Sequence, residues 1–427
     1  MNTISVTLTD IKVIFRQLEQ VRVALSESNF AFRSLGIITG GAALTLHLCF
    51  ALRVSTTLTG DMTEYHAIAI HIIRHQYYGI YAKPDAYVTP IYPLFITCIY
   101  LALHFLFGIS FSGGSDIVRS FYLVQQIITL TIPLFCYILA FRISGRWSGL
   151  AAAMLSVMYL PNNFIGSMML TEALYIPLLL ALLILLDIFL RGESTVASAT
   201  LGVIYGLTVL TRPTAGIILP VTLVLYFVVN RQSDHLIRKL FRHVSPLLLG
   251  TVIVILPWII RNAIALHQFV PLSTEGANPL LLGASPNFDL TQYTLMTLAH
   301  ESHKTLSSFT MQYIENGFEY HFFKYLIWYT IGRFPDYFLS PWILWWWANT
   351  ATFVNFHRVI VFMGLITTAI ACSKSRLRFI GVNVTILLIV QWPFQPIVRY
   401  VYPIIVVWCA LIPITLGHKA TSSPSNQ

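Results

Sequence analysis

Long apolar segments recur along the whole chain, and they restrict its fold more than any other feature. A bilayer span needs about 20 consecutive, mostly apolar residues. Candidate spans that meet or approach this length are residues 35–57, 119–141, 147–166, 174–190, 197–211, 214–229, 244–264, 352–371, 377–393 and 400–416. Only 10% of the 427 residues are charged, whereas a soluble protein carries roughly a quarter. We therefore expect an all-α, polytopic membrane protein with about ten transmembrane helices.

The distribution of Lys and Arg predicts how these helices are threaded. Short cytoplasmic loops are enriched in basic residues, and residues 142–146, 231–242, 374–378 and the arm 1–34 are all basic. If all four lie in the cytoplasm, the apolar segment 91–108 must stay in the first outer loop without crossing. The net charge of +9 then lies on the cytoplasmic side, against anionic lipids. We therefore expect membrane lipids, and no nucleic acid, as partners.

This threading divides the chain into five parts. They are a cytoplasmic arm (1–34), a membrane module (35–264) that contains the first outer loop (59–118), a second long outer loop (265–350), C-terminal transmembrane helices (351–417) and a cytoplasmic tail (418–427). Long loops in compact proteins usually carry function. Within these two loops we predict a helix over about 62–76, extended chain with turns over 271–278, amphipathic helix over about 290–330 and a Trp-rich interfacial run at 341–347.

Three acids lie where an outward-facing site would use them. Asp61 follows the first span, and Glu64 comes one helical turn later, so both could face one cavity. Glu172 opens the fourth span. From the residues alone, such acids suit a general base, a cation ligand or a proton relay. Glu172 also fits a structural role, because the helix dipole favours an acid in the first turn.

Three arginines are expected on the same face. Arg212 lies at the turn between the fifth and sixth spans, Arg261 lies near the end of the seventh, and Arg399 enters the last. A guanidinium can bind two phosphate oxygens at once, and a nearby carboxylate can deprotonate a hydroxyl. Together they indicate group transfer from a lipid phosphate or pyrophosphate to an acceptor outside the cytoplasm, although each arginine alone also fits an interfacial anchor.

His66, His71 and His75 fall on or near one face of the predicted helix 62–76. A three-His metal site needs further ligands, so ordinary helix-surface histidines are the favoured interpretation. The sequence predicts no specific cofactor, and it leaves open whether the protein binds a divalent cation.

The sequence resembles the GT-C membrane glycosyltransferases, which include protein O-mannosyltransferases, bacterial lipid A aminoarabinose transferases and oligosaccharyltransferases. The resemblance covers about residues 35–410, and it looks strongest to the bacterial branch similar to dolichyl-phosphate-mannose mannosyltransferases. The matching pieces are residues 61–67, Thr89-Pro90-Ile91-Tyr92-Pro93 with the apolar stretch to Gly108, Thr171-Glu172, residues 210–213, residues 257–262 with 271–274, and Arg399-Tyr400 before Pro403.

The resemblance implies a GT-C fold and a role for several residues. Asp61 would be the general base, Glu172 would shape the site or hold a cation, and Arg399 would bind the donor phosphate. Tyr65, Lys83, Arg212, Arg261 and Tyr400 complete the substrate-binding residues that we expect. Relatives often carry a basic residue or His before the proline, where this chain has Thr89, so Lys83 is the candidate to supply that charge. Relatives also often place an acid directly beside the Asp, whereas here it comes at Glu64, whose role stays open.

We therefore expect a lipid-carrier-dependent glycosyltransferase in the inner (cell) membrane, with its active site facing the periplasm or exterior. It would transfer a sugar from a polyprenyl-phosphate donor to a glycolipid, glycan or protein acceptor by inverting displacement. The alternative is a transporter or flippase of lipid-linked sugars, which would need ionisable residues through the membrane midplane. Acids inside the predicted spans are nearly absent, with Asp187 close to an inner end. A non-catalytic subunit with the same fold is a third possibility, against which the intact Asp61 and Arg399 argue.

Overall fold

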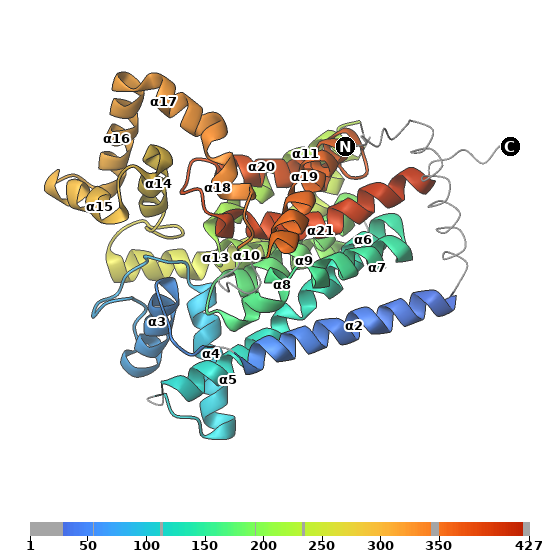
Figure 1. Ribbon diagram of the computed structural model, residues 1–427, viewed down its shortest axis with the longest axis horizontal. Helices are drawn as coiled ribbons and strands as arrows, with labels where there is room; N and C mark the ends of the chain where they lie inside the picture. The colour runs from blue at the N-terminus through green and yellow to red at the C-terminus, as the bar shows by residue number, and fades with distance from the viewer. Residues whose placement is uncertain are drawn as a thin grey trace, which may run out of the picture.

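The computed structural model describes residues 29–53, 55–111, 114–192, 194–232, 235–342 and 350–421. Most of the predicted cytoplasmic arm, residues 343–347 of the Trp-rich run and the tail from residue 422 lie outside the described residues. In the described ranges every regular element is helical (Figure 1). The expected all-α fold is confirmed.

The helices follow one another closely along the chain. In order they are α2 (Asn29–Leu52), α3 (Asp61–His75), α4 (Ile91–Phe107), α5 (Ser115–Thr129), α6 (Thr131–Ser144), α7 (Arg146–Met158), α8 (Pro161–Phe164), η1 (Ile165–Ser167), α9 (Glu172–Leu190), α10 (Thr195–Val209), η2 (Pro213–Ile217), α11 (Ile218–Asn230), α12 (Leu236–Lys239), η3 (Leu240–Val244), α13 (Ser245–Leu266), α14 (Ala277–Ala284), η4 (Pro286–Phe288), α15 (Gln292–Glu301), α16 (Leu306–Tyr320), α17 (Phe322–Ile327), η5 (Trp328–Gly332), α18 (Phe334–Phe338), α19 (Ala351–Ser373), α20 (Arg378–Gln391) and α21 (Val398–Thr421).

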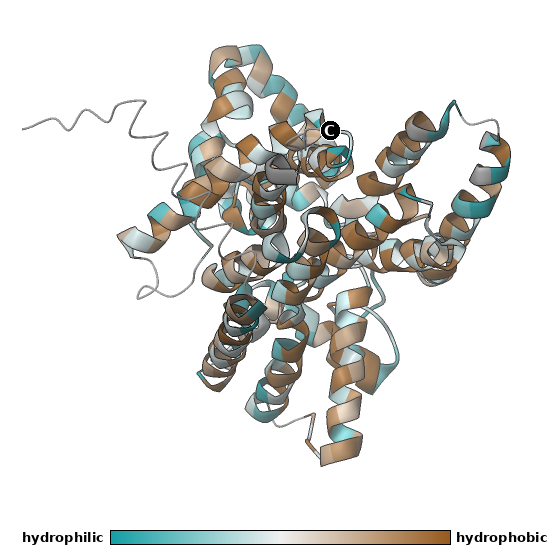
Figure 2. Ribbon diagram, turned by 90° about the vertical axis from the view of Figure 1, so that its right-hand side faces the viewer, coloured by the Kyte–Doolittle hydropathy of each residue, from teal (hydrophilic) through white to brown (hydrophobic). Residues whose placement is uncertain are grey.

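Six helical segments are long and apolar enough to cross a membrane. They are 29–52, 115–144, 172–190, 240–266, 351–373 and 398–417. Three more predicted spans are apolar helices of 10–17 residues, at 195–209, 213–228 and 378–391. The chain is an integral membrane protein, and Figure 2 shows hydrophobic residues along most of its helices. Ile37 on α2, for example, is 75% exposed. Exposed apolar side chains of this kind suit contact with lipid.

The predicted span 147–166 differs from the structure, because it is not one helix. Helix α7 ends at Met158, Tyr159 has an extended backbone, and Pro161 begins the separate helix α8. Proline has no N–H to donate, so it is tolerated in the first turn of a helix and disrupts a helix interior.

The predicted helix at 62–76 is confirmed by α3, whereas the second long loop differs from its prediction. The expected amphipathic helix over 290–330 is divided into α15, α16, α17 and η5. Thr305 begins α16 as an N-cap, since its side chain accepts a hydrogen bond from the Ser308 N–H. Helix α14 also begins at Ala277, inside the stretch 271–278 that was expected to be extended.

Helix α21 lies at the centre of the bundle. Of its membrane-length segment, 83% is buried inside the protein, and Trp408 has no exposed surface. The Trp408 ring packs against Gly364 of α19, where an added Cβ would lie 2.2 Å from a ring atom. From Val401 to Thr415 α21 is surrounded by protein, whereas its first residues, 398–400, are partly exposed.

The two long loops lie at the same end of the bundle, which we call the loop end. Figure 1 shows α3 and α14 to α17 at the left, opposite the start of α2 and the distal part of α21. Helix α4 runs across the direction of α2 there, which agrees with the placement of residues 91–108 in the first long loop. The loops are also bonded to each other, since the Thr274 and Glu275 N–H groups donate to the Ala86 and Tyr87 carbonyls at 2.9 and 3.1 Å.

Helices α10 and α13 approach each other closely at two glycines. A Cβ added to Gly202 would lie 2.0 Å from the Leu247 carbonyl oxygen, and one added to Gly250 would lie 2.5 Å from the Ala199 carbonyl oxygen. Both obstructing atoms are backbone, so a larger residue forces the helices apart. Small residues that permit such contact are the usual basis of helix packing in membranes.

We predict that Gly202→Ala destabilises the protein by about 1–3 kcal/mol, the usual penalty for overpacking. Thermal unfolding of the purified protein in detergent measures the effect. Gly41→Ala in α2 is the matched control, because nothing lies within 4 Å of its added Cβ, and it should leave the melting temperature unchanged or raise it. Equal melting temperatures for the two variants would contradict the close packing.

Candidate active site

Four charged residues come together at the loop end because four chain segments begin or turn there. Asp61 is the first residue of α3, and Glu172 is the first residue of α9. Arg399 lies in the first turn of α21. Arg212 has an extended backbone directly before Pro213, the conformation that a following proline favours. Three of these segments are separated by a hundred or more residues in sequence, so only the fold brings them together.

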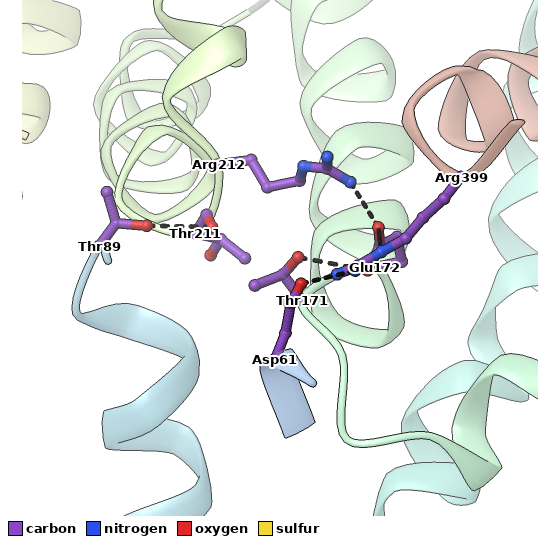
Figure 3. Close-up of polar contacts among 7 residues, drawn as sticks. All are labelled: Asp61, Thr89, Thr171, Glu172, Thr211, Arg212 and Arg399. Atoms are coloured by element: carbon purple, nitrogen blue, oxygen red, sulfur yellow. Dashed lines mark hydrogen bonds and ion pairs between the residues drawn. The ribbon is translucent and has the colours of Figure 1, made fainter. Parts of the chain in front are cut away.

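Glu172 is at the centre of the cluster, and its side chain is completely buried. Its Oε1 accepts hydrogen bonds from Arg399 Nε at 2.6 Å and from Arg212 Nη1 at 2.8 Å. Its Oε2 accepts from Arg399 Nη2 at 3.3 Å and from the Thr171 hydroxyl at 3.3 Å. Figure 3 shows the two arginines reaching Glu172 from different elements. Glu172 therefore fixes the orientation of both guanidinium groups.

Asp61 joins this cluster through Arg399. Arg399 Nη1 donates to Asp61 Oδ2 at 2.6 Å (Figure 3). The Asp61 side chain is 41% exposed, compared with 17% for Arg399 and none for Glu172. Asp61 is therefore the accessible acid of the cluster, and Glu172 is the buried one.

Asp61, Arg212 and Arg399 border a cavity of about 360 Å³. It is lined by Asp61, Tyr65, Val88, Thr89, Thr171, Thr211, Arg212, Pro213, Thr214, Pro271, Leu272, Ser273, Glu275, Gly276, Pro279, Gln391, Phe394, Arg399 and Tyr400. The wall near Thr89 is held to α10, because the Thr89 hydroxyl donates to the Thr211 carbonyl at 3.1 Å and the Ile91 N–H donates to the Leu210 carbonyl at 3.1 Å. Of the residues expected from sequence, Asp61, Tyr65, Arg212, Arg399 and Tyr400 line the cavity, and Glu172 supports it from behind.

Tyr65 and Tyr400 surround the charged cluster with aromatic surface. Tyr65 is 5% exposed, and burial raises its pKa, with the charge of Glu275 adding to the shift. The Arg212 guanidinium lies over the Tyr400 ring at 5.5 Å and over the Tyr175 ring at 5.6 Å. These stacked contacts help to hold Arg212 in place.

Arg261 and Lys83 do not line this cavity, in contrast to the sequence-based expectation. Arg261 donates at 2.6 Å to the carbonyl oxygens of Asp85 and Tyr78, and it lies over the Tyr78 and Trp258 rings. Arg261 thus fixes the backbone of the first long loop against α13. Lys83 is exposed in the same loop.

Glu64 lies near the cluster without lining the cavity. It is half-buried, and burial raises its pKa, with smaller contributions from the charges of Asp61 and Asp85. The two acids of the first turn of α3 are therefore not equivalent, since only Asp61 borders the cavity.

Sequence reasoning missed Glu275, which lines the cavity from the second long loop. Burial and the charge of Asp61 together raise the pKa of Glu275 to about 7, against the opposing charges of Arg212 and Arg399. A signal was present, because Glu275 is the only acid in the stretch from Pro271 to Asn278. Its distance from the other charged residues along the chain hid its relevance.

The arrangement does not fit a divalent cation between Asp61 and Glu172. Arg399 fills that position, with nitrogen atoms 2.6 Å from each carboxylate, and a guanidinium there repels a cation. No group of three or more His, Cys, Asp or Glu side chains in the described ranges could hold a metal ion. Of the α3 histidines, His66 contacts the Tyr100 hydroxyl and His71 the Gly79 carbonyl, both at 2.8 Å.

Comparison with known proteins agrees with this fold. Residues 105–260 match the family model of dolichyl-phosphate-mannose-protein mannosyltransferase. No curated protein sequence matches the chain.

Solved structures with a similar fold include the archaeal oligosaccharyltransferase AglB from Archaeoglobus fulgidus in complex with an inhibitory peptide and a dolichol-phosphate. It has a TM-score of 0.55 and 12% sequence identity, over 93% of this chain and 52% of that one. The Archaeoglobus fulgidus oligosaccharyltransferase tethered to an acceptor peptide has a TM-score of 0.55 and 14% identity, over 90% and 49%. This chain thus spans about half the length of those enzymes. ArnT from Cupriavidus metallidurans bound to undecaprenyl phosphate matches more weakly, with a TM-score of 0.40 and 13% identity, over 90% and 78%. The expected GT-C fold is confirmed.

We predict that Glu172→Gln destabilises the protein by about 3–5 kcal/mol, because breaking a buried ion pair leaves the partner charges without compensation. Thermal unfolding in detergent measures the loss. Asp289→Asn is the control: it breaks the ion pair with Lys324, in which both side chains are about half exposed, and it should cost about 1 kcal/mol or less. A melting temperature of Glu172→Gln within error of that control would show that Glu172 is not what holds the arginines.

Proposed function

We propose that this protein transfers a sugar from a polyprenyl-phosphate donor to an acceptor on the outer face of the membrane, by inverting displacement. The observation that carries the proposal is the Asp61–Arg399–Glu172 contact at the cavity. It joins an accessible carboxylate to a guanidinium that a buried carboxylate orients. A cavity of about 360 Å³ is within the usual range for a small ligand. The family match to mannosyltransferases over residues 105–260 supports the same reaction class.

Arg212 and Arg399 are suited to bind the donor phosphate. Both line the cavity, and each guanidinium offers several N–H donors in a fixed plane. Glu172 uses one edge of each group, which holds them ready before the substrate arrives. As the bond between the anomeric carbon and the phosphate oxygen breaks, charge develops on the phosphate, and preorganised donors stabilise that charge.

Asp61 is suited to be the general base. In the proposed step the acceptor oxygen forms a bond to the anomeric carbon, its proton passes to Asp61, and the lipid phosphate leaves with the bonding electrons of the broken bond. Asp61 shares Arg399 Nη1, so a phosphate that binds this nitrogen competes with Asp61 for it. Donor binding would then free the base to act on the acceptor, and we infer that the donor binds first.

The proposal also covers the orientation of the protein in the membrane and the acceptor of the sugar. The charge distribution of the sequence favours the loop end outside the cytoplasm, in the periplasm or exterior next to the inner (cell) membrane. A glycolipid, a glycan or a protein can each provide the attacking hydroxyl group. The sugar can be a hexose or a pentose.

A transporter or flippase of lipid-linked sugars is the second candidate. It would need ionisable groups along a path through the membrane. Asp187, the acid inside the predicted spans, pairs instead with Arg142 at 3.2 Å and Arg191 at 2.8 Å at the C-terminal end of α9. Asp187 and its two arginine partners lie at the opposite end of α9 from Glu172, which favours a group-transfer site at one end. A non-catalytic subunit is disfavoured because Asp61 and Arg399 are both present and form an ion pair.

We predict that Asp61→Asn lowers turnover by about 10²–10⁴-fold, the usual contribution of a general base. Transfer is measured in membranes that contain a polyprenyl-phosphate sugar, with mass spectrometry of the products. Glu64→Gln is the matched control, because Glu64 is on the same helix turn and outside the cavity, and it should lose much less. Near-normal transfer by Asp61→Asn would rule out Asp61 as the base.

Replacing Arg399 with Lys tests the phosphate site. Lysine keeps the charge and loses the planar fork that contacts two groups at once. We expect the KM for the donor to rise at least tenfold, while the KM for the acceptor changes little. An unchanged donor KM in a variant that unfolds at the wild-type temperature would remove Arg399 from the donor site.

A further inference from the structure

Glu275 is brought to the cavity by the pairing of the two long loops. Its N–H donates to the Tyr87 carbonyl at 3.1 Å, next to the bond from Thr274 to Ala86. These bonds fix the backbone of Glu275 against the first loop. Its side chain lines the same cavity as Asp61, Arg212 and Arg399. The position of Glu275 is therefore set by main-chain contacts, independently of the charged cluster.

In the part of the chain that the structure describes, Glu275 differs from Asp61 and Glu172 in having no ionic partner. Arg399 pairs with Asp61, and both arginines pair with Glu172. Among the described residues, the Glu275 carboxylate makes no hydrogen bond or ion pair, although it is half-buried. The groups that act on it are the acids Asp61 and Glu64 of α3, Arg212 before η2, and Arg399 of α21. Tyr65, Tyr78, Tyr87 and Tyr400 also lie within its electrostatic reach.

The charges at the cavity leave one negative charge in excess. Asp61, Glu172 and Glu275 are three carboxylates, and Arg212 and Arg399 are two guanidiniums. A sugar linked through a phosphodiester carries one further negative charge. A second uncompensated negative charge in a partly buried cavity is costly. Protonating Glu275, which has no ionic partner among the described residues, removes one negative charge at the lowest cost in free energy.

We propose that Glu275 is a further donor-binding residue, which takes up one proton from solvent as the anionic lipid phosphate enters and then donates a hydrogen bond to the bound phosphate or sugar as a neutral acid. The proposal rests on the proposed function and adds a residue to it. The proton returns to solvent when the phosphate leaves, so the cycle as a whole is balanced. Glu275 would thereby select an anionic ligand over a cationic one only while it carries this proton.

The direction of the pH dependence follows from this uptake. The pKa of Glu275, raised by burial to about 7, means that Glu275 in the free protein is mostly protonated at pH 6 and mostly ionised at pH 8. Binding then takes up almost no proton at pH 6 and nearly one at pH 8. Linkage requires affinity to fall as pH rises through that pKa. The expected loss between pH 6 and pH 8 is about tenfold.

Binding to the protein in lipid nanodiscs tests the proposal. The probe is the methyl ester of undecaprenyl phosphate, a phosphodiester that keeps one negative charge over this range, so that the ligand itself does not titrate. Wild type should lose about tenfold in affinity from pH 6 to pH 8. Calorimetry at pH 8 in two buffers of different ionisation enthalpy should give an uptake near one proton.

Variants assign the proton to its residue. Glu275→Gln should bind the probe with an affinity that does not change between pH 6 and pH 8, and with no proton uptake. Glu315→Gln, which removes an exposed acid of the same loop, should keep the wild-type pH dependence. Glu275→Asp keeps a titrating group and should keep a pH-dependent affinity.

Several outcomes overturn the proposal. A wild-type affinity that does not change with pH, or the absence of proton uptake by wild type, overturns it without any variant. A Glu275→Gln variant that keeps the wild-type pH dependence also overturns the proposal. A Glu275→Gln variant that unfolds at the wild-type temperature but binds no probe at any pH overturns it as well. A wild type that binds no probe at any pH overturns the proposed function as well, which separates the two failures.

Discussion

The burial of Glu172 is the constraint on which the rest of the site depends. A carboxylate without exposed surface at the start of a membrane helix is tolerable only when it is fully paired, and Glu172 is paired by Arg212 and Arg399. Each arginine comes from a different part of the chain, so meeting the needs of one acid fixes the ends of three segments against one another. Arg399 then holds Asp61 as well, and the first helix of the loop end is brought into place. The cavity is the space that this arrangement leaves open.

The sequence predicts on which side of the membrane each charged residue lies, but it does not predict where that residue lies within the plane of the membrane. Hydropathy and basic loops placed Asp61, Glu172, Arg212 and Arg399 at one end, because a span fixes the depth of the residues beside it. Arg261 has the same depth and charge, yet it contacts the backbone at Tyr78 and Asp85, since lateral position depends on which helices pack together. Glu275 was missed for a related reason: its place depends on main-chain bonds to residues about 190 positions earlier. The break at Pro161 shows that apolar length alone does not guarantee a continuous helix.

The site combines two kinds of support that respond differently to change. Its charges come from helix ends inside a packed bundle, where α21 is almost wholly surrounded by protein. Part of its wall comes from the two long loops, which main-chain and side-chain hydrogen bonds join between residues 86–87 and 274–278. Segments held by few bonds open at lower free energy than a packed core does. We therefore expect the loop wall to open more readily than the charged cluster.

The wide spacing of the Glu172 partners along the chain has a consequence for biogenesis. Arg212 follows Glu172 by 40 residues, whereas Arg399 follows it by 227. A chain that is synthesised and inserted from its N-terminus thus carries Glu172 with a single partner, and Asp61 without Arg399, until α21 enters the bilayer. During that interval the nascent protein holds an incompletely neutralised acid at the membrane surface. The arrival of α21 supplies the missing cation and the central packing surface together, so that assembly of the bundle and completion of the site are one event.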